Sequence, residues 1–331
     1  MQPITSFENL FQGAVSLERT AGGIKPWRIP YEDVVLYPPD GISGKGQIAN
    51  CVRLSFRSEA TEVRVRTVAP DPQMLMDVVI DNELFATAHP DADGWFTFSG
   101  LPGREKTIDV YLSQSLPVIV AGLEISEGAS WAPAPVTSPR WITYGSSITQ
   151  CSAAASPSQT WPAIVARKTG WHLTCLGFGG SCHIEPMVAR LIRDLPADFI
   201  SMCLGINVYG GSSLSARTFR PAVIGMVKIV REKHPDIPIA LMSPIYSPPR
   251  EKQPNAVGLT LEMMRQEIVA AVEALRSRGD NNLIYVNGLD IFGPDDVDHL
   301  PDNLHPDAEG YKTMAERFLQ KVVPQVKLGG K

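Results

Sequence analysis

Between about residues 30 and 125, apolar and polar residues alternate one by one along the chain. Clear runs of this kind are 52–57, 62–66 and 107–112. A repeat of two places neighbouring side chains on opposite faces of a β-strand, and the Pro, Gly, Asp and Asn residues between the runs favour turns. The pattern predicts an antiparallel, jelly-roll-like β-sandwich domain over residues 1–130, with one face of each strand buried and no helix of useful length.

Two closely spaced prolines, Pro133 and Pro135, end this alternation. Proline lacks an amide N–H and is poorly accommodated in helices and central strands, so regular structure is not expected around them. We predict that residues 131–137 form a short, stiff linker and that a second domain covers residues 138–331.

After the linker the hydrophobic pattern changes from alternating to continuous. Five short runs are apolar on both faces: 141–144, 173–178, 199–206, 237–245 and 283–286. Between and after them, apolar residues recur at helical spacing in four segments: 188–195, 219–230, 261–275 and 311–322. Strands that are apolar on both faces indicate a parallel sheet covered on both sides. The second domain is therefore predicted to be a three-layer α/β/α fold of flavodoxin-like type, with Pro306 at the first position of its last helix.

The composition narrows the functional classes. The chain has 331 residues, a net charge of −5 and no basic run, which argues against nucleic acid and anionic membrane surfaces as partners. No apolar stretch reaches the roughly 20 residues that span a bilayer. The N-terminus lacks a basic segment followed by an apolar one, so a cytoplasmic location is expected, with a secreted form whose signal has been removed left open. The five cysteines show no CxxC spacing, which favours reduced thiols. The oligomeric state is not predicted.

Residues with catalytic potential follow the predicted strands at the edge where such sheets bind ligands. Ser147 follows the first strand of the second domain, Gly180 the second and Asn207 the third. Asp302 and His305 precede the last helix. Because the carboxyl ends of parallel strands meet at one edge, these five residues are expected to converge.

The residue types match the needs of acyl transfer. A serine hydroxyl is a weak nucleophile until a base removes its proton, and the base needs a third group to fix its tautomer. We predict Ser147 as the nucleophile, His305 as the general base and Asp302 as the group that orients it. The backbone N–H of Ser147, the backbone N–H of Gly180 and the side-chain amide of Asn207 are the predicted oxyanion donors. No metal site is predicted, because the His and Cys spacing matches none, and no cofactor is expected.

Each signal has an ordinary structural alternative. A serine between small residues is usually only a turn residue, and Asp-x-x-His before a helix is often a capping arrangement. Ser181 is a rival nucleophile, but a G-x-S-x-G motif needs glycine where His183 stands. His299, with Asp296 three residues before it, is the main rival base. Only the order of the segments along the chain makes the Ser147 hypothesis specific.

That order resembles the SGNH (GDSL-type) hydrolase family. The segment 145–149 is similar to the first block of the family, 205–207 to the third and 302–306 to the fifth, while Gly180 resembles the glycine of the second block. The resemblance covers about residues 138–325 and implies the same triad and oxyanion donors.

The chain departs from the family pattern at several points. Ser146 stands where the family usually has aspartate, and Val208 where an aspartate often follows the asparagine. Neither position carries the triad, so altered turn hydrogen bonding is expected rather than lost chemistry. Three glycines in the second block leave the register of the oxyanion glycine open by one residue. The charged pair Arg250–Glu251 is interpreted by default as a solvated surface pair, with a family-like loop at the rim of the pocket as the alternative.

A β-sandwich followed by this α/β domain also resembles bidomain carbohydrate esterases. The leading hypothesis is a serine-dependent esterase that forms an acyl-enzyme on Ser147 and cleaves short-chain acyl esters, with acetyl favoured. Its substrate would be a small-molecule ester or an acylated sugar. The alternatives are an acyltransferase that uses the same triad and a non-catalytic carbohydrate-binding protein.

Overall fold

The protein is described by a computed structural model that covers residues 1–136 and 139–328. The chain divides into two compact units. The first contains Met1–Ser138 together with Ala155–Cys175, and the second contains Pro139–Ala154 and Leu176–Lys331. The sequence analysis placed a single boundary at residues 131–137 and did not predict that residues 155–175 belong to the first unit.

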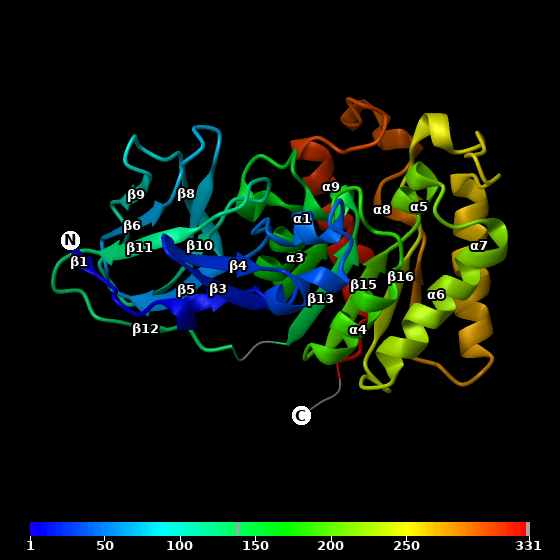
Figure 1. Ribbon diagram of the computed structural model, residues 1–331, viewed down its shortest axis with the longest axis horizontal. Coiled ribbons are helices and arrows are strands. Elements are labelled where there is room, and N and C mark those ends of the chain that lie inside the picture. Colours follow the sequence, from blue (N-terminus) through cyan, green and yellow to red (C-terminus); the bar gives the residue numbers. More distant parts are fainter. Residues whose placement is uncertain (137–138, 329–331) are drawn as a thin grey trace. The chain divides into compact units, whose positions relative to one another are not determined.

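The first unit contains two antiparallel sheets (Figure 1). One has the order β3 (Ser16–Thr20), β4 (Gly23–Trp27), β11 (Val120–Ile125), β6 (Glu62–Thr67), β9 (Trp95–Ser99), with β1 (Gln2–Pro3) beside β11. The other has the order β12 (Trp131–Pro133), β5 (Arg53–Ser58), β10 (Lys106–Tyr111), β7 (Met76–Ile80), β8 (Glu83–Ala88), with β2 (Phe11–Gln12) beside β5. The predicted antiparallel sheets are confirmed.

The alternation along the strands separates a core face from a polar face. Leu54, Phe56 and Val110 belong to the buried hydrophobic cluster of this unit. The alternate positions of the same strands carry polar residues, yet Arg53 and Asp109 are also buried. The expectation that only one face of each strand is buried is therefore wrong for β5 and β10.

The returning segment 155–175 is bonded to the second sheet through buried polar groups. The carboxylate of Asp77 on β7 accepts hydrogen bonds from the hydroxyl of Ser156 and the backbone N–H of Ser158, each with a donor–acceptor distance of 2.7 Å. The guanidinium of Arg167 donates to the carbonyl of Asn82 over 2.8 Å. A buried carboxylate with several donors is well satisfied, so these bonds hold the segment to this sheet.

The segment 155–175 contains a helix that the sequence reasoning missed. The helix α3 (Trp161–Thr169) is capped by Thr160, which accepts from the N–H of Ala163, and it ends at Gly170 with φ +71°. It follows the short 3₁₀ turn η3 (Pro157–Gln159). The other helical pieces of the unit are short: η1 (Glu8–Leu10), η2 (Tyr31–Leu36) and α1 (Ile42–Gly46).

The predicted linker is partly regular structure. Trp131–Pro133 forms the edge strand β12, in which Ala132 pairs with Arg57 of β5. Proline is tolerated on edge strands because its missing N–H can face away from the neighbouring strand. Residue 137, the last of the predicted linker, lies outside the described residues.

The second domain contains a five-stranded parallel sheet. Its order is β14 (His172–Gly177), β13 (Arg140–Gly145), β15 (Phe199–Cys203), β16 (Ile239–Met242), β17 (Leu283–Val286). Two strands are shorter than predicted. The strand expected over 199–206 ends at Cys203, because Gly205 has φ +124° and a helix begins at Ile206. The strand expected over 237–245 covers only Ile239–Met242.

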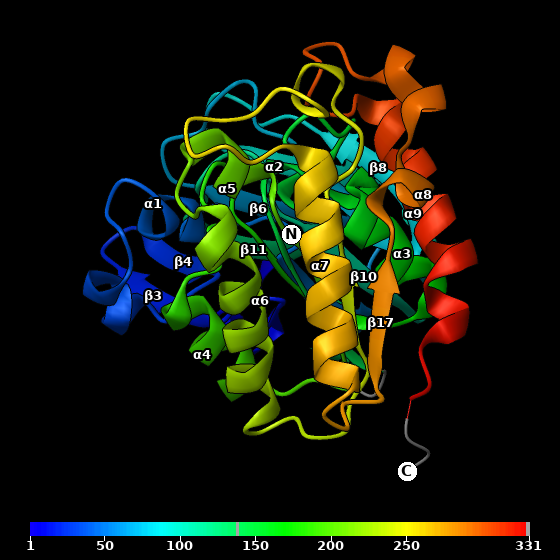
Figure 2. The same cartoon turned by 90° about the vertical axis from the view of Figure 1, so that its right-hand side faces the viewer.

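Helices cover both faces of this sheet, which confirms the three-layer prediction. The longer ones are α4 (Pro186–Asp194), α6 (Ala216–Arg231), α7 (Leu261–Arg276) and α9 (Ala308–Lys321), and the shorter ones are α2 (Ser147–Gln150), α5 (Ile206–Gly211) and α8 (Gly288–Ile291). Single turns are η4 (Pro248–Arg250), η5 (Pro294–His299) and η6 (Val323–Gln325). Figure 2 shows α7 and α9 on opposite sides of β17. The ring of Phe318 on α9 stacks on Trp141 of β13, with centroids 5.4 Å apart.

The start of α9 differs from the prediction. Asp307 caps the helix, and its carboxylate accepts from the N–H of Gly310 over 2.8 Å. The helix begins at Ala308, so Pro306 lies before it rather than at its first position. Among the described residues, no helix is both long and apolar enough to cross a membrane.

Candidate active site

Ser147 is the first residue of α2 and is separated from the end of β13 by Ser146 alone. The turn before it is fixed by Ser146, which is fully buried and whose hydroxyl accepts from the N–H of Ile148 over 3.2 Å. Serine is a good N-cap residue, so it supplies here the acceptor that an aspartate would also supply. The departure from the family pattern at this position therefore preserves the turn.

Ser147, His305 and Asp302 form a continuous hydrogen-bonded chain. Ser147 Oγ lies 2.8 Å from His305 Nε2, and His305 Nδ1 lies 2.6 Å from Asp302 Oδ2. An ionised carboxylate can only accept, so Nδ1 carries the proton and Nε2 is left as the acceptor for the serine hydroxyl. This is the tautomer that a general base needs.

The environment of Asp302 keeps it ionised. Partial burial would by itself raise its pKa, but hydrogen bonds outweigh that effect and lower the pKa to about 2. These bonds come from the N–H and ring of His305 and from the N–H of Leu304. The aspartate therefore fixes both the imidazole and the loop that carries it. The capping alternative for this motif does not hold, because Asp307 caps α9.

The three predicted oxyanion donors follow β13, β14 and β15: Ser147 begins α2, Gly180 lies in the loop after β14, and Asn207 lies in α5. The side-chain oxygen of Asn207 accepts from the N–H of Cys182 over 3.0 Å. The N–H of Gly179 is occupied by Gln150 Oε1 at 2.9 Å. Within the part of the chain that the structure describes, Asn207 Nδ2 and the N–H groups of Ser147 and Gly180 have no acceptor. This favours Gly180 over Gly179 as the glycine donor.

A comparison of the sequence with models of protein families agrees with this arrangement of residues. The model of the GDSL-like Lipase/Acylhydrolase family matches residues 139–323. The chain belongs to this family. A second model, that of the SsfX3 N-terminal domain, matches residues 10–119. No curated protein sequence matches the chain.

Solved structures of GDSL-like and related proteins match most of the length of this chain. The salicylyl-acyltransferase SsfX3 from a tetracycline biosynthetic pathway is 36% identical, with a TM-score of 0.87, and the match covers 96% of each chain. A putative GDSL-like lipase from Bacteroides ovatus is 20% identical with a TM-score of 0.79 over 99% of each chain. A family two carbohydrate esterase from Clostridium thermocellum is 15% identical, with a TM-score of 0.63 over 83% of this chain and 92% of that one. The last two likenesses concern the fold alone.

Residues 183–185, whose contacts the sequence did not predict, hold the loop that follows β14 and carries Gly180. Ile184 has φ +65°, which is unfavourable for a β-branched residue. Its N–H donates to the hydroxyl of Tyr144, which itself donates to Glu185 Oε2 over 3.0 Å. The N–H of His183 donates to the same oxygen over 3.2 Å. Burial raises the pKa of Glu185. An acidic residue alone in an otherwise uncharged stretch was the one sequence feature that could have pointed to these contacts.

The loop that carries Asp302 and His305 is held by the segment 247–251, which includes the pair Arg250–Glu251. Ser247 Oγ donates to the carbonyl of Asn303 over 2.7 Å, and Arg250 Nη1 donates to the same oxygen over 3.1 Å. Glu251 forms a bidentate, largely buried ion pair with Arg265 at 2.6 and 2.8 Å. The surface interpretation is therefore wrong for Glu251, whereas Arg250 is only half-buried.

The rival residues are bonded elsewhere. Ser181 Oγ donates to the carbonyl of Gly179 over 3.4 Å. His183 contacts Ser213 and the carbonyl of Gly180. His299 pairs with Asp307 at 3.2 Å. Asp296, three residues before His299, pairs with Arg317 and accepts from the N–H of Gly293.

A narrow apolar crevice is lined by residues that are next to the proposed site residues in the sequence. A water-sized sphere does not fit into it. Its lining includes Ile148, Ile206 and Leu304, the direct neighbours of Ser147, Asn207 and His305. Among the described residues, no group of three or more His, Cys, Asp or Glu is arranged to hold a metal ion.

Proposed function

We propose that this GDSL-like protein is a serine-dependent esterase that cleaves short-chain acyl esters. The observation that carries the proposal is the unbroken chain from Ser147 through His305 to Asp302, with the tautomer that a base requires. A serine that only stabilised a turn would not need an imidazole at 2.8 Å whose other nitrogen is bonded to a carboxylate.

In the first half-reaction, Ser147 Oγ attacks the acyl carbon and its proton passes to His305 Nε2. The negative charge on the carbonyl oxygen is stabilised by the N–H groups of Ser147 and Gly180 and by Asn207 Nδ2. Asp302 stabilises the imidazolium. The ester C–O bond then breaks, the leaving alcohol takes the proton from His305, and the acyl group stays on Ser147.

In the second half-reaction, water takes the place of the alcohol. His305 accepts a proton from water as its oxygen attacks the acyl carbon, and the same donors bind the second oxyanion. The bond to Ser147 Oγ breaks, and that oxygen recovers its proton from His305. The products are a carboxylic acid and the free enzyme.

We propose acetyl as the preferred group and a small-molecule ester or acylated sugar as the substrate. The support for this choice is the architecture, an antiparallel β-unit with a GDSL-like domain, whose fold is similar to that of a family two carbohydrate esterase. The apolar crevice lined by Ile148, Ile206 and Leu304 admits no water-sized sphere and therefore cannot itself hold an acyl group.

An acyltransferase is the second candidate, and one observation favours it. The salicylyl-acyltransferase SsfX3 is 36% identical over 96% of both chains, so the similarity includes both domains. The same acyl-enzyme would pass its acyl group to an alcohol rather than to water. A purely carbohydrate-binding role is not supported, because Ser146 preserves the turn and the triad is complete.

The experiment compares hydrolysis of p-nitrophenyl acetate, butyrate and octanoate by the wild type and by Ser147→Ala. We expect activity to fall with chain length and to disappear in the variant, and Ser152→Ala on the neighbouring turn serves as the control. Activity that does not depend on Ser147 would disprove the acyl-enzyme. Adding alcohols as competing acceptors then separates the two candidates: an acyltransferase forms mainly the new ester, whereas an esterase forms mainly free acid.

A further inference from the structure

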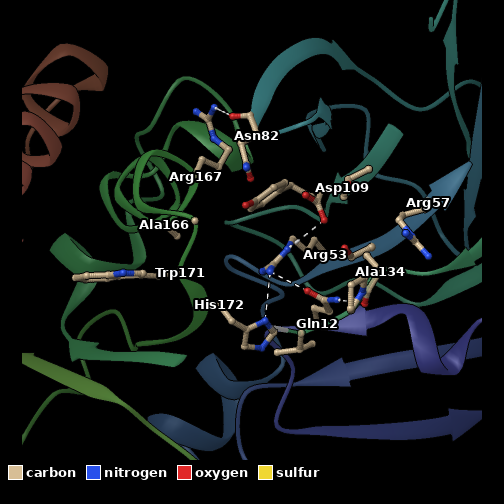
Figure 3. A pocket seen from close by; sticks show the side chains of 16 residues that line it. Gln12, Arg53, Arg57, Asn82, Asp109, Ala134, Ala166, Arg167, Trp171 and His172 are labelled. Carbon is tan, nitrogen blue, oxygen red and sulfur yellow. Dashed lines mark hydrogen bonds and ion pairs between the residues drawn. The ribbon is translucent and has the colours of Figure 1, made fainter. Parts of the chain in front are cut away.

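The polar face of the second sheet in the first unit carries a cavity. Residues of β5 and β10 that pair across the two strands share this face: Arg53 with Tyr111, Ser55 with Asp109, and Arg57 with Thr107. Together with residues of the segment 155–175 they line a cavity of about 250 Å³ (Figure 3). None of the triad or oxyanion residues belongs to its lining.

A buried arginine forms part of the cavity wall. Arg53 is only 8% exposed, and Figure 3 shows it bonded to Asp109, Gln12 and His172. Its Nε lies 3.3 Å from Asp109 Oδ1, and its Nη2 donates to Gln12 Oε1 over 2.9 Å. Its Nη1 has no acceptor among the described residues and is not sealed from solvent. A buried guanidinium with an unused nitrogen facing a cavity is a strong donor held ready for an acceptor.

Two further buried side chains offer unused hydroxyls. Tyr111 and Ser55 are each 3% exposed, and within the described residues neither hydroxyl makes a hydrogen bond. Neither oxygen is sealed from solvent. Burial raises the pKa of Tyr111 to about 12, so its hydroxyl remains a donor at neutral pH. Buried polar groups usually have partners, so these three residues offer hydrogen-bonding groups that either solvent or a bound ligand can use.

The charge of the lining favours an anion. Three arginines and one aspartate line the cavity, which gives a net charge of +2 with histidine neutral, in a chain whose overall charge is −5. The guanidinium of Arg167 donates to the carbonyls of Asn82 and Ser158 rather than to a carboxylate. Arg57 has only a loose, exposed ion pair with Glu105 at 3.7 Å. Asp109 therefore balances Arg53 and leaves two positive charges at the site.

We propose that this cavity binds a small hydroxylated carboxylate of the size of one sugar acid. Arginine matches the geometry of a carboxylate, and the hydroxyls of Tyr111 and Ser55 suit the hydroxyls of the ligand. The cavity is slightly smaller than the roughly 300–1,000 Å³ that holds drug-sized ligands, which limits the occupant to a single ring. The site is independent of the reaction proposed for Ser147.

The test is titration calorimetry of the full chain with D-glucuronate, D-glucose and acetate. Glucuronate should bind with one-to-one stoichiometry, and its affinity should fall at high salt because an exposed arginine contributes. Glucose, which lacks the carboxylate, should bind at least about tenfold more weakly. Acetate should also bind more weakly, because it lacks the hydroxyls. Equal affinity for glucose and glucuronate would overturn the assignment of an anion site, and failure of glucuronate to bind would overturn the ligand class.

Two conservative variants locate the binding. Tyr111→Phe removes one hydroxyl and should weaken glucuronate binding about threefold to tenfold, the effect of losing one hydrogen bond. Arg57→Gln should weaken it by a similar factor and reduce its salt dependence. Tyr31→Phe and Arg104→Gln, which change residues outside the lining, are the matched controls, and a thermal melt of each variant verifies folding. Binding that is the same in all five proteins would place glucuronate elsewhere and disprove the site.

Discussion

The backbone N–H of Cys182 donates to the side-chain oxygen of Asn207, and this one contact sets the direction of the asparagine amide. Because an N–H needs an acceptor, the oxygen must face Cys182 and Nδ2 must face away from it. The contact joins the loop after β14, which carries the proposed donor Gly180, to the start of α5, which carries the proposed donor Asn207. The direction of the proposed donor Asn207 Nδ2 is therefore set before substrate binds, as stabilisation of a developing charge would require.

Asn207→Asp tests this arrangement. The aspartate keeps an oxygen for the N–H of Cys182 but replaces the Nδ2 donor with a negative oxygen. We expect kcat to fall by at least two to three orders of magnitude, with a small change in KM and an unchanged melting temperature. Steady-state kinetics with p-nitrophenyl acetate measures the effect, and Asn281→Asp on the exposed loop before β17 is the control. A decrease of less than tenfold would show that Asn207 does not contact the oxyanion.

Ser247→Ala tests the support of the triad loop. The change removes the hydroxyl that donates to the carbonyl of Asn303, one residue from Asp302. We expect kcat to fall about threefold to tenfold while KM stays nearly constant, because one neutral hydrogen bond positions the catalytic pair. Asn303 has φ +59°, which glycine adopts freely, so Asn303→Gly should keep most of the activity. If Ser247→Ala changes KM and leaves kcat intact, the residue serves binding rather than positioning.

The sequence reasoning predicted the features that depend on local patterns. The alternation through Leu54 and Phe56 predicted the sandwich strands, and continuous apolar runs predicted the parallel sheet. Ser147, His305 and Asp302, which the structure links by hydrogen bonds, could be proposed because each lies at a fixed place relative to a strand or helix. The partner of Glu251, by contrast, is fourteen residues away on another element, and no periodicity reports such a pair. The return of the segment that contains Ser156 depends in the same way on a buried carboxylate, Asp77, distant in the chain.

The pH dependence of the reaction follows from the state of Asp302. Its pKa of about 2 lies below the ordinary value of 3.8, so its contacts stabilise the loop above about pH 4 and are lost as the pH falls toward 2. The carboxylate therefore does not titrate between about pH 4 and 7 and should add no inflection to the rate profile there. We expect the logarithm of kcat/KM to fall with unit slope on the acid side. A slope of two, or a second inflection near pH 4, would show that Asp302 also gains a proton.

Asp302→Asn removes the carboxylate without changing its shape. An amide can present its N–H₂ group to Nδ1 and so favour the wrong imidazole tautomer, for which we expect a loss of roughly 10³–10⁴ in kcat. The measurement is the single-turnover rate of acyl-enzyme formation. Asp298→Asn, in the 3₁₀ turn before the same loop, is the control and should retain the wild-type rate. A variant that still acylates at more than about a tenth of the wild-type rate would remove Asp302 from the triad.

Glu185→Gln separates the charge of this residue from its hydrogen bonds. Burial raises the folded-state pKa of Glu185, so the folded protein binds the proton more tightly than the unfolded chain does. By linkage, wild-type stability falls as the pH rises from about 4.3, the ordinary value for glutamate, through the raised pKa. Glutamine still offers an oxygen to Tyr144 and to the N–H of His183 but does not titrate. We therefore expect the variant to gain in melting temperature relative to the wild type as the pH rises from about 4 to 7.

The same variant distinguishes positioning from stability. Because the loop bonds survive, kcat on p-nitrophenyl acetate should stay within about threefold of the wild type, whereas Glu185→Ala, which releases Tyr144 and the strained Ile184, should lose about tenfold or more. Thermal melts over the pH range and kinetics at neutral pH provide both readouts. A constant difference in melting temperature between wild type and Glu185→Gln at every pH would show that Glu185 does not titrate in this window. Equal kcat values for the Gln and Ala variants would show that the loop holds Gly180 without the Glu185 contacts.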